Sequence, residues 1–253
     1  MKPILSVKNL GINFGGLRAV SGFNLDVYPN ELVGLIGPNG AGKTTVFNML
    51  SGLYVPSDGT IELCGEQIQG KDCASIVSKG IARTFQNIRL FTDQSVADNV
   101  KIALGSHYPY SFMDAVLRNK KYQQQEEKLE MESYRLLEIM HLANVKDVKA
   151  KNLPYGKQRQ LEIARALATH PKLLLLDEPA AGMNPNETKE LMEVIRQVRQ
   201  QFGLAILLIE HDMKLVMEIC EKITVLNYGM ILTSGSAAQV QSNPEVIKAY
   251  LGD

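Results

Sequence analysis

A glycine-rich stretch near the N-terminus has the residue types that could hold a phosphate chain. Residues 37–45, GPNGAGKTT, fit the pattern GxxxxGK followed by Ser or Thr, between an apolar run and a helical run. Glycines let backbone N–H groups converge on phosphate oxygens, and the N-terminus of the following helix adds its positive dipole end. The context predicts a nucleotide site rather than an ordinary strand-to-helix turn. The residues expected to form the cradle are Gly37, Pro38, Asn39, Gly40, Ala41, Gly42, Lys43, Thr44 and Thr45.

Side chains in this stretch and in a second one predict the chemistry at the phosphates. Lys43 would supply a point charge between the β- and γ-phosphates, and the Thr44 hydroxyl would ligate Mg²⁺. The apolar run at 173–176 is followed by Asp177 and Glu178. Two carboxylates are thereby placed at the C-terminal end of a buried strand, where ligands bind in open α/β sheets. Asp177 is expected to hold Mg²⁺ through its water shell, and Glu178 to orient the attacking water or accept its proton.

Alternating strands and helices have to position these residues. The first third of the chain reads as short strands separated by Gly, Pro, Asn and Asp: ILSVKNLGINF, GFNLDVYP, ELVGLIGP and GTIELCG. After residue 170, the apolar runs KLLLLDEP and LAILLIEH flank the helical pattern NETKELMEVIRQVRQQF. Continuous apolar runs are typical of parallel strands buried on both faces, and a strand–helix–strand order at this length indicates a right-handed crossover.

The sequence changes character between about residues 88 and 165. KKYQQQEEKLEMESYRLLEIMHL is charged and helical, with Leu129, Leu136, Leu137 and Met140 on one face. This pattern predicts a helical insertion, either as a solvated surface helix pair or with a direct binding role. We therefore expect one α/β domain over 1–253. Its core, with an antiparallel β portion at the N-terminus, would span about 1–87 and 166–253, and its helical subdomain 88–165.

Composition and charge argue against several classes of protein. The 253 residues carry 27 Lys and Arg against 27 Asp and Glu, so the chain lacks the basic footprint of a general nucleic-acid binder. The N-terminus has no signal-peptide pattern, and no stretch approaches the roughly 18 apolar residues of a membrane span. The three widely spaced cysteines indicate free thiols in a reducing compartment rather than metal ligands. We expect a protein that is soluble in itself, with any membrane role arising through a partner.

Taken together, these motifs resemble the ATP-binding subunit of an ABC transporter over essentially the full chain. The resemblance implies a P-loop NTPase core with an N-terminal antiparallel β subdomain and an inserted α-helical subdomain, and it implies ATP and Mg²⁺ at the site. Gln86, in RTFQ, resembles the Q-loop glutamine that senses Mg²⁺ and nucleotide and faces the membrane subunit. His211, in LLIEHDM, resembles the switch histidine that contacts the γ-phosphate. Phe14, in GINFGG, matches the aromatic that stacks on adenine, with a strand-end core residue as the alternative.

The stretch LPYGKQRQLEIARAL aligns without a gap with the family signature LSGGQ and its following helix. Pro154 replaces the serine, Tyr155 the first glycine and Lys157 the glutamine, while Gly156 is retained. In the family the signature closes over the γ-phosphate bound by the other subunit, which implies a dimer with two composite sites. Without the serine, one charge-assisted hydrogen bond and one capping side chain are lost. Two alternatives stay open: Tyr155 or Lys157 partly replaces the contact, or both side chains point to solvent.

The departures from the family pattern resemble one branch. The xYG-type signature, AAGMNPNETKEL, IEHDMKLVM and the ending NPEVIKAYLG are similar to the ATPases of high-affinity branched-chain amino-acid importers. Urea-type importers and the lipopolysaccharide-export ATPase are neighbouring branches. The implied function is ATP hydrolysis that energises uptake of branched-chain amino acids through ATP-driven dimer closure, at the cytoplasmic face of the membrane. The implied partners are a second ATP-binding subunit, identical or homologous, integral membrane permease subunits and, indirectly, an extracytoplasmic substrate-binding protein, with no nucleic acid.

Two further expectations concern coupling and rival functions. Leu90 and Phe91, in NIRLF, are expected to contact a short cytoplasmic helix of the membrane subunit, with ordinary subdomain core as the alternative. Asn184 stands where the family has the D-loop aspartate, so charge-dependent contacts across the dimer are not expected there. A soluble ABC ATPase of DNA repair or translation would usually carry paired nucleotide domains or coiled coils. A kinase-like transferase would need an acceptor pocket and a lid.

Overall fold

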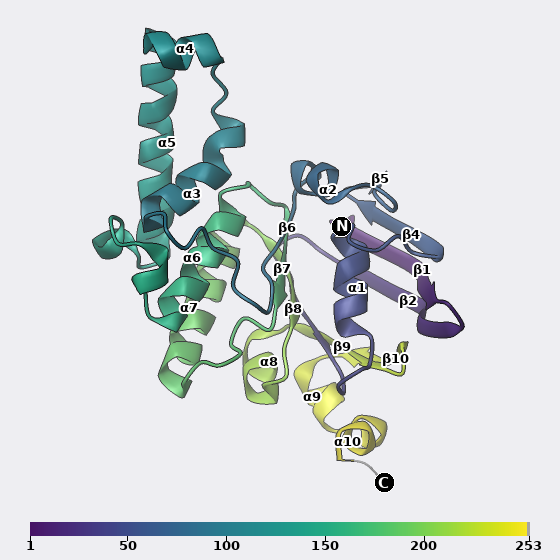
Figure 1. The fold of residues 1–253 in the computed structure, drawn as a ribbon. Helices are drawn as coiled ribbons and strands as arrows, with labels where there is room; N and C mark the ends of the chain where they lie inside the picture. Colours follow the sequence, from purple (N-terminus) through teal and green to yellow (C-terminus); the bar gives the residue numbers. More distant parts are fainter. Residues whose placement is uncertain (252–253) are drawn as a thin grey trace. The chain divides into compact units, whose positions relative to one another are not determined.

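The chain divides at two points, between Gln86 and Asn87 and between Pro171 and Lys172. The computed structural model describes residues 1–251, so the last residue of the expected terminal motif, Gly252, lies outside the described part. One unit combines Met1–Gln86 with Lys172–Asp253, and the other, Asn87–Pro171, is inserted into it (Figure 1). The second division falls beyond the signature helix, whereas the sequence suggested residue 165. The reason is that this helix packs on other helices of the inserted unit.

A six-stranded sheet in the order β10-β9-β3-β8-β7-β6 forms the centre of the first unit (Figure 1). Strands β9, β3, β8, β7 and β6 pair in parallel, and β10 pairs antiparallel with β9. Every residue of β3, β7 and β8 is buried, as the continuous apolar runs predict for strands covered on both faces. The strands are β3 (Leu32–Ile36), β6 (Ile81–Arg83), β7 (Leu173–Asp177), β8 (Ala205–Ile209), β9 (Lys222–Asn227) and β10 (Met230–Gly235).

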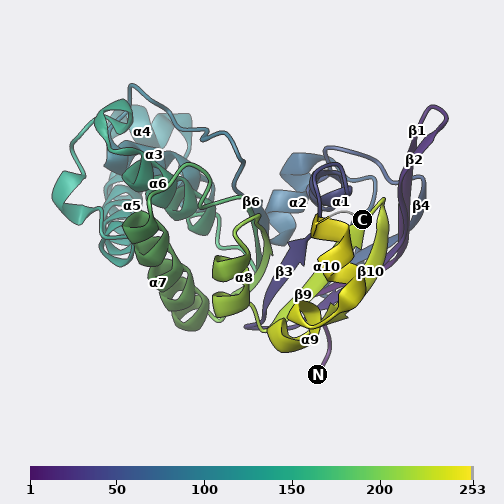
Figure 2. The same ribbon diagram turned by 90° about the horizontal axis from the view of Figure 1, so that it is seen from below.

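Helices of the first unit follow these strands. The predicted helix between the two apolar runs is α7, and its expected inner face, Leu191, Val194, Ile195 and Val198, is buried. Because β7 and β8 are adjacent and parallel, the expected strand–helix–strand unit is confirmed. Helices α9 and α10 lie beside β9 and β10 (Figure 2). The helices are α1 (Lys43–Leu50), α2 (Cys73–Lys79), α7 (Pro185–Phe202), α8 (Met213–Ile219), α9 (Ala237–Gln241) and α10 (Pro244–Leu251).

The N-terminal antiparallel portion is a four-stranded sheet in the order β2-β1-β4-β5. Its apolar side chains join those of the larger sheet and of α1 in one buried cluster that includes Phe23 and Phe47. Of the four strands expected in the first third of the chain, three belong to this sheet and the third in order, β3, belongs to the larger one. The strands are β1 (Leu5–Phe14), β2 (Leu17–Val27), β4 (Asp58–Leu63) and β5 (Glu66–Gln67).

The inserted unit is helical. Its long helix α5 packs on α3 and α6 through the expected apolar face, in which Leu129, Leu136, Leu137 and Met140 are all buried. Helix α4 lies at the far end of α5 (Figure 1). The helices are α3 (Val96–Leu104), α4 (Phe112–Leu117), α5 (Lys120–Ile139) and α6 (Tyr155–Leu167), with single 3₁₀ turns at Gly105–His107, Ala143–Val145 and Ala150–Asn152.

In the part of the chain that the structure describes, no helix combines the length and the apolar character needed to cross a bilayer.

Candidate functional site

The phosphate loop begins where β3 ends and is shaped by its glycines. Gly37 has φ +151°, and a Cβ there would clash with the carbonyl oxygen of Leu226, so no larger residue fits. Gly42 is the left-handed N-cap residue of α1, which starts at Lys43. The Nζ of Lys43 donates hydrogen bonds to the carbonyl oxygens of Gly37 (2.7 Å) and Pro38 (2.9 Å). The loop therefore curls around the ammonium group at the N-terminus of α1, a position that suits a phosphate.

Lys43 is a buried cation. Burial lowers the pKa of Lys43 from its usual value, because the charged form loses hydration, while the carboxylates of Glu178 and Asp177 act in the opposite direction. A phosphate chain would add further negative charge at the same point. The loop is therefore built to gain stability from an anionic ligand.

Asp177, the last residue of β7, is held by an arginine that the sequence did not single out. Asp177 Oδ2 accepts a hydrogen bond from Arg83 Nη2 at 2.7 Å, and both side chains are almost fully buried. Arg83 ends β6, and its Nη1 donates to Asn48 Oδ1 (2.7 Å) and Ser51 Oγ (2.9 Å) on and after α1. A buried ion pair thus fixes the strand end against the helix that follows the phosphate loop.

Three residues predicted from three separate motifs meet at the next position. Glu178 Oε1 lies 2.5 Å from His211 Nε2, and Glu178 Oε2 accepts a hydrogen bond of 2.7 Å from Gln86 Nε2. Glu178 also has φ +48°, a left-handed conformation that costs a residue with a Cβ about 1–2 kcal/mol. Its backbone N–H donates to the Ile209 carbonyl (2.9 Å), which holds this turn on the neighbouring strand. His211 and Gln86 therefore orient the carboxylate from both of its oxygens, and the hydrogen bond to Ile209 anchors the strained backbone that carries it.

Glu210 is a buried carboxylate that the sequence reasoning missed. It accepts hydrogen bonds from the backbone N–H groups of Ala180 (2.7 Å) and His211 (3.0 Å). Burial raises the pKa of Glu210, and the hydrogen bonds partly oppose the shift. Glu210 follows β8 as Glu178 follows β7, and this equivalent position was a signal that could have revealed it. Its place between the two loops indicates that it positions His211.

Lys43, Glu178 and His211 are among the residues that line a cavity of about 480 Å³. Tyr228, which is 85% exposed and has φ +46°, is an aromatic at this cavity that the sequence did not indicate. Phe14 pairs in register with Leu17, which lines the cavity, and its half-exposed ring meets Tyr54 edge-on at 5.2 Å. Phe14 is thus exposed at the end of β1 rather than buried in the core. The lining residues are Leu17, Arg18, Ala19, Asn39, Gly40, Ala41, Gly42, Lys43, Thr44, Thr45, Glu178, His211 and Tyr228.

Thr44 in this cavity, Asp177 next to Glu178, and Gln86, bonded to Glu178, form a donor set that fits Mg²⁺. Thr44 contributes a hydroxyl, Asp177 a carboxylate and Gln86 an amide, and hard oxygen donors of this kind are those that Mg²⁺ prefers. Mg²⁺ is commonly held by only one or two carboxylates together with substrate phosphates, so a phosphate cradle beside Asp177 suits it.

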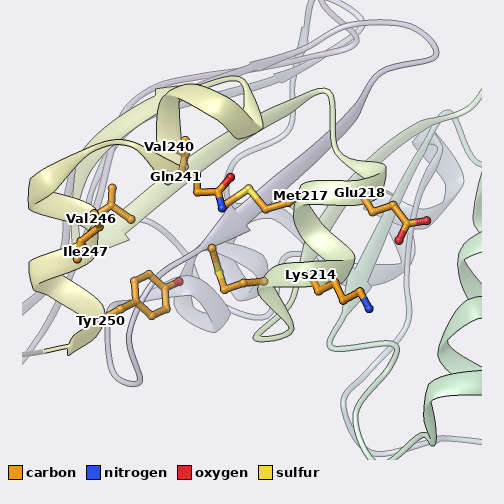
Figure 3. A pocket seen from close by; sticks show the side chains of 9 residues that line it. Lys214, Met217, Glu218, Val240, Gln241, Val246, Ile247 and Tyr250 are labelled. Atoms are coloured by element: carbon orange, nitrogen blue, oxygen red, sulfur yellow. The ribbon is translucent and has the colours of Figure 1, made fainter.

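A second cavity, of about 640 Å³, lies between α8, α9 and α10 (Figure 3). Its walls are mostly apolar, with Met213, Met217, Val246 and Ile247 among the lining residues. Burial raises the pKa of Tyr250 in this wall to about 12, although a hydrogen bond from the Gly37 backbone favours the ionised form. The last described helix therefore touches the first glycine of the phosphate loop.

The signature-like helix α6 begins as the sequence predicts. Pro154 is its N-cap residue and provides no side-chain hydrogen bond, and Gly156 is buried in the first turn. The Tyr155 hydroxyl accepts a hydrogen bond from Arg159 Nη2 at 3.2 Å, and Lys157 Nζ donates to the His141 carbonyl at 3.4 Å. Both side chains that replace the signature residues thus make contacts inside the helical unit.

A buried charge pair connects this helix to the segment that follows Gln86. Arg159 is 0% exposed, and its Nη1 donates to Glu162 Oε2 at 2.7 Å. Glu162 Oε1 in turn accepts the backbone N–H of Arg89 (3.4 Å), and Arg165 Nη1 donates to the Arg89 carbonyl. The Arg165 guanidinium lies 4.6 Å from the centre of the Phe91 ring. Helix α6 therefore holds the main chain of Arg89 on both sides.

Phe91 has a fixed backbone and a half-exposed ring. Its N–H donates to Asn99 Oδ1 (2.9 Å), and Asn99 Nδ2 donates to its carbonyl (2.9 Å), with Asn99 fully buried. The ring is 44% exposed, and Leu90 is half-buried. Ordinary subdomain core does not account for a ring presented in this way.

Asn184, at the position of the family's D-loop aspartate, caps a helix. Its Oδ1 accepts the backbone N–H groups of Asn186 (3.0 Å) and Glu187 (3.1 Å), and Glu187 Oε2 accepts the Asn184 N–H (3.0 Å). This capping box gives the amide side chain a structural role at the start of α7.

Known proteins resemble the chain over its whole length. A family model described as ABC transporter matches residues 20–181, and one described as branched-chain amino acid ATP-binding cassette transporter matches 231–253. The high-affinity branched-chain amino acid transport ATP-binding proteins BraF of Pseudomonas aeruginosa and LivG of Escherichia coli K12 are each 46% identical over 252 residues, which cover 100% of this chain and 99% of theirs. The lipopolysaccharide export ATP-binding protein LptB of Haemophilus influenzae is 33% identical over 99% of this chain and 98% of its own. The crystal structure of the ADP conformation of an ATP-binding cassette of an ABC transporter matches with a TM-score of 0.85 at 29% identity, covering 100% of both chains.

Proposed function

The chain belongs to the ABC transporter family of transport ATPases, and on that premise we propose that it powers the import of branched-chain amino acids. The proposal depends most on the arrangement of three residues predicted from separate motifs. Glu178 and His211 line the cavity that contains Lys43, and Gln86 donates a hydrogen bond to Glu178. The 46% identity to BraF and LivG over the full chain supports branched-chain amino acids as the transported substrate. The family match at the C-terminal end points the same way.

The phosphate chain of ATP would be bound by the loop that follows β3. Backbone N–H groups of the glycine-rich turn and the N-terminus of α1 supply partial positive charge, and Lys43 supplies a full one. Exchanging its two carbonyl partners for phosphate oxygens would give Lys43 stronger, charge-assisted hydrogen bonds. Phe14, whose exposed ring follows the strand beside Leu17, would stack on the base and contribute about 1–3 kcal/mol.

Thr44, Asp177 and Gln86 would hold Mg²⁺. When bound, the ion neutralises charge on the phosphate oxygens during phosphoryl transfer. Arg83 would keep the Asp177 carboxylate in place at the end of β7, since the two are joined at 2.7 Å in a buried pair.

Glu178 would orient the attacking water and accept its proton, as a general base. Its carboxylate is already fixed by His211 and Gln86, so little reorganisation is needed when the water arrives. His211 would then contact the γ-phosphate, and Glu210 would position it through the backbone hydrogen bond of 3.0 Å.

A second ATP-binding subunit, identical or homologous, would complete each site. The helix N-terminus at Pro154 and the Gly156 backbone would contact the γ-phosphate held by the partner subunit. Tyr155 and Lys157 would replace the lost serine indirectly, because their bonds to Arg159 and to the His141 carbonyl set the first turn of α6.

Permease subunits would bind the helical unit through the half-exposed ring of Phe91 and the adjacent Leu90. The protein would therefore work at the cytoplasmic face of the membrane, with an extracytoplasmic binding protein delivering the amino acid to the permease. Substitution Phe91→Ala is expected to uncouple ATP hydrolysis from uptake. Unchanged uptake and complex assembly would refute this contact.

The catalytic assignment is tested with Glu178→Gln. The variant is expected to bind ATP and dimerise, but to hydrolyse ATP roughly 10²–10⁴-fold more slowly, the usual contribution of a general base. Glu193→Gln, on the exposed side of α7, is the matched control and should hydrolyse normally. Hydrolysis by Glu178→Gln at the wild-type rate would contradict the mechanism.

The cargo is tested by uptake of labelled leucine and labelled urea in cells whose own branched-chain importer ATPase is deleted. Leucine uptake should return with the wild-type chain and not with Glu178→Gln. Restored urea uptake alone would assign the chain to the neighbouring branch.

A further inference from the structure

Helix α4 presents its apolar side to solvent. Phe112 is 81% exposed and Leu117 67%, and Met113 and Val116 are also more than half exposed. Positions i, i+1, i+4 and i+5 lie on one side of a helix, so these four side chains form one continuous apolar strip. Helix α4 lies at the end of α5 (Figure 1). A surface helix normally buries such a strip, so its exposure calls for a partner.

Asp114, outside the apolar strip, caps α4 and connects it to the start of α5. Asp114 and Ser111 form a capping box, with Ser111 N donating to Asp114 Oδ2 (2.8 Å) and Asp114 N donating to Ser111 Oγ (3.1 Å). Asn119 Nδ2 also donates to Asp114 Oδ1 (2.6 Å). These bonds, those from Ser111 first, lower the pKa of Asp114 to about 2. Helix α4 is therefore held at the start of α5 by specific hydrogen bonds.

Cations border the apolar strip. Arg118 is the left-handed C-cap residue of α4, and the exposed Lys120 and Lys121 follow at the start of α5. Asp114, the carboxylate of this segment, is only 3.6 Å from Lys121 Nζ, so its charge is paired locally. The segment next to the strip therefore carries more positive than negative charge.

Two tyrosines complete the segment. The rings of Tyr110 and Tyr122 meet edge-on with centroids 5.0 Å apart, one before α4 and one in the first turn of α5. Aromatic rings with a polar tip are enriched at the level of lipid headgroups. Interfacial helices bind anionic bilayers through this combination of an apolar strip, adjacent cations and tyrosines.

We propose that α4, with Arg118, Lys120 and Lys121, is a membrane-surface anchor that inserts Phe112, Met113, Val116 and Leu117 into the interface of an anionic bilayer. Charge complementarity favours a lipid surface over a second protein: the exposed cations Arg118, Lys120 and Lys121 outnumber the two carboxylates of the segment 110–126. Of these carboxylates, Asp114 pairs with Lys121 at 3.6 Å and Glu126 accepts a hydrogen bond of 2.8 Å from the Tyr110 hydroxyl. The proposal does not depend on the transported cargo, because it concerns the isolated chain and a vesicle.

The chain contains no tryptophan, which allows a direct test. Phe112→Trp in the full chain would carry the sole indole. Its emission is expected to shift to the blue and to be quenched by brominated lipid when vesicles contain phosphatidylglycerol, and to change little with phosphatidylcholine alone. Met131→Trp, an exposed apolar position of α5 outside the strip, is the matched control and should not respond.

Binding strength is measured by vesicle flotation. Replacing Lys120 and Lys121 by glutamine should weaken binding roughly 30-fold, from about 1 kcal/mol for each cation near an anionic surface. Phe112→Asp combined with Leu117→Asp should abolish flotation while ATP hydrolysis and circular dichroism stay unchanged. Equal response to both lipid compositions, or flotation of the double aspartate variant, would overturn the proposal. Loss of permease capture without any vesicle binding would also overturn it and would assign the strip to a protein contact.

Discussion

Replacing Arg159 by methionine is expected to destabilise the protein by about 3–5 kcal/mol. Arg159 is 0% exposed, and its partner Glu162, at 2.7 Å, has a side chain that is 6% exposed. Removing one member of a buried ion pair leaves the other as an uncompensated buried charge, and this desolvation cost sets the magnitude. The substitution also removes the hydrogen bond to Tyr155, about 1 kcal/mol within that range. Against a total stability of about 5–15 kcal/mol, the loss is large.

The assay is urea unfolding followed by circular dichroism, as a double-mutant cycle. Arg159→Met and Glu162→Met alone should each lower the midpoint by roughly 1 M or more, taking a slope of about 3 kcal/mol/M. The double variant should recover most of the loss, because apolar side chains of similar volume can replace a buried pair. Arg196→Met is the control, since its 2.9 Å pair with Glu218 is half-exposed and should contribute less than about 1 kcal/mol.

The reasoning is refuted if Arg159→Met is no less stable than Arg196→Met. It is refuted equally if the double variant is as unstable as the sum of the single ones, because the cost would then come from lost packing rather than from an unpaired charge.

Further predictions concern other buried groups. Arg83→Met should lower the free energy of unfolding by about 3–5 kcal/mol, measured in urea, because Asp177 would lose its buried partner; a change below 1 kcal/mol would contradict the pairing. Burial raises the pKa of Glu210 above its ordinary value of 4.5, so the stability this group contributes is present at lower pH and lost as pH rises through the raised pKa. Measured by unfolding across that range, the stability of Glu210→Gln relative to the wild type should increase as pH rises. If the two proteins show the same dependence of stability on pH, the raised pKa is contradicted. Burial also raises the pKa of Cys220 to about 12, so iodoacetamide at mildly alkaline pH should label the two exposed cysteines and spare Cys220 until urea is added, as read by intact mass.

Local pattern was sufficient to predict the parts of the site that depend on chain-local geometry. The glycine spacing of residues 37–45 requires a strand before it and a helix after it, and β3 and α1 are found there. The four leucines before Asp177 form a fully buried strand because only a strand covered on both faces tolerates such a run. The expected inner faces of α5 and α7 are buried for the same reason, a helical period of apolar residues.

The rest depended on contacts between residues far apart in the chain. Arg83 pairs with Asp177 across 94 positions, and no local period marks either residue as the partner of the other. Arg159 is a charged residue on an amphipathic helix, where a surface position would be expected. It is fully buried because its guanidinium donates a hydrogen bond to the Glu162 carboxylate. The outward apolar strip of α4 is accompanied by hydrogen bonds of Asp114 to Ser111 and Asn119, which no helical period marks. Periodicity alone predicts the opposite orientation.

Helix α6 is hydrogen-bonded to both the N–H and the carbonyl of Arg89. Because Glu162 holds the amide and Arg165 the carbonyl of one peptide segment, a displacement of α6 carries the main chain before Phe91 with it. Coupling between two binding sites is reciprocal, so each site changes the affinity of the other by the same factor. In the proposed complex, a permease helix that favours one position of Phe91 would therefore change nucleotide affinity at the start of α6 by the same factor as nucleotide changes permease affinity. The membrane subunit would act on the ATPase through the same few bonds by which the ATPase acts on it.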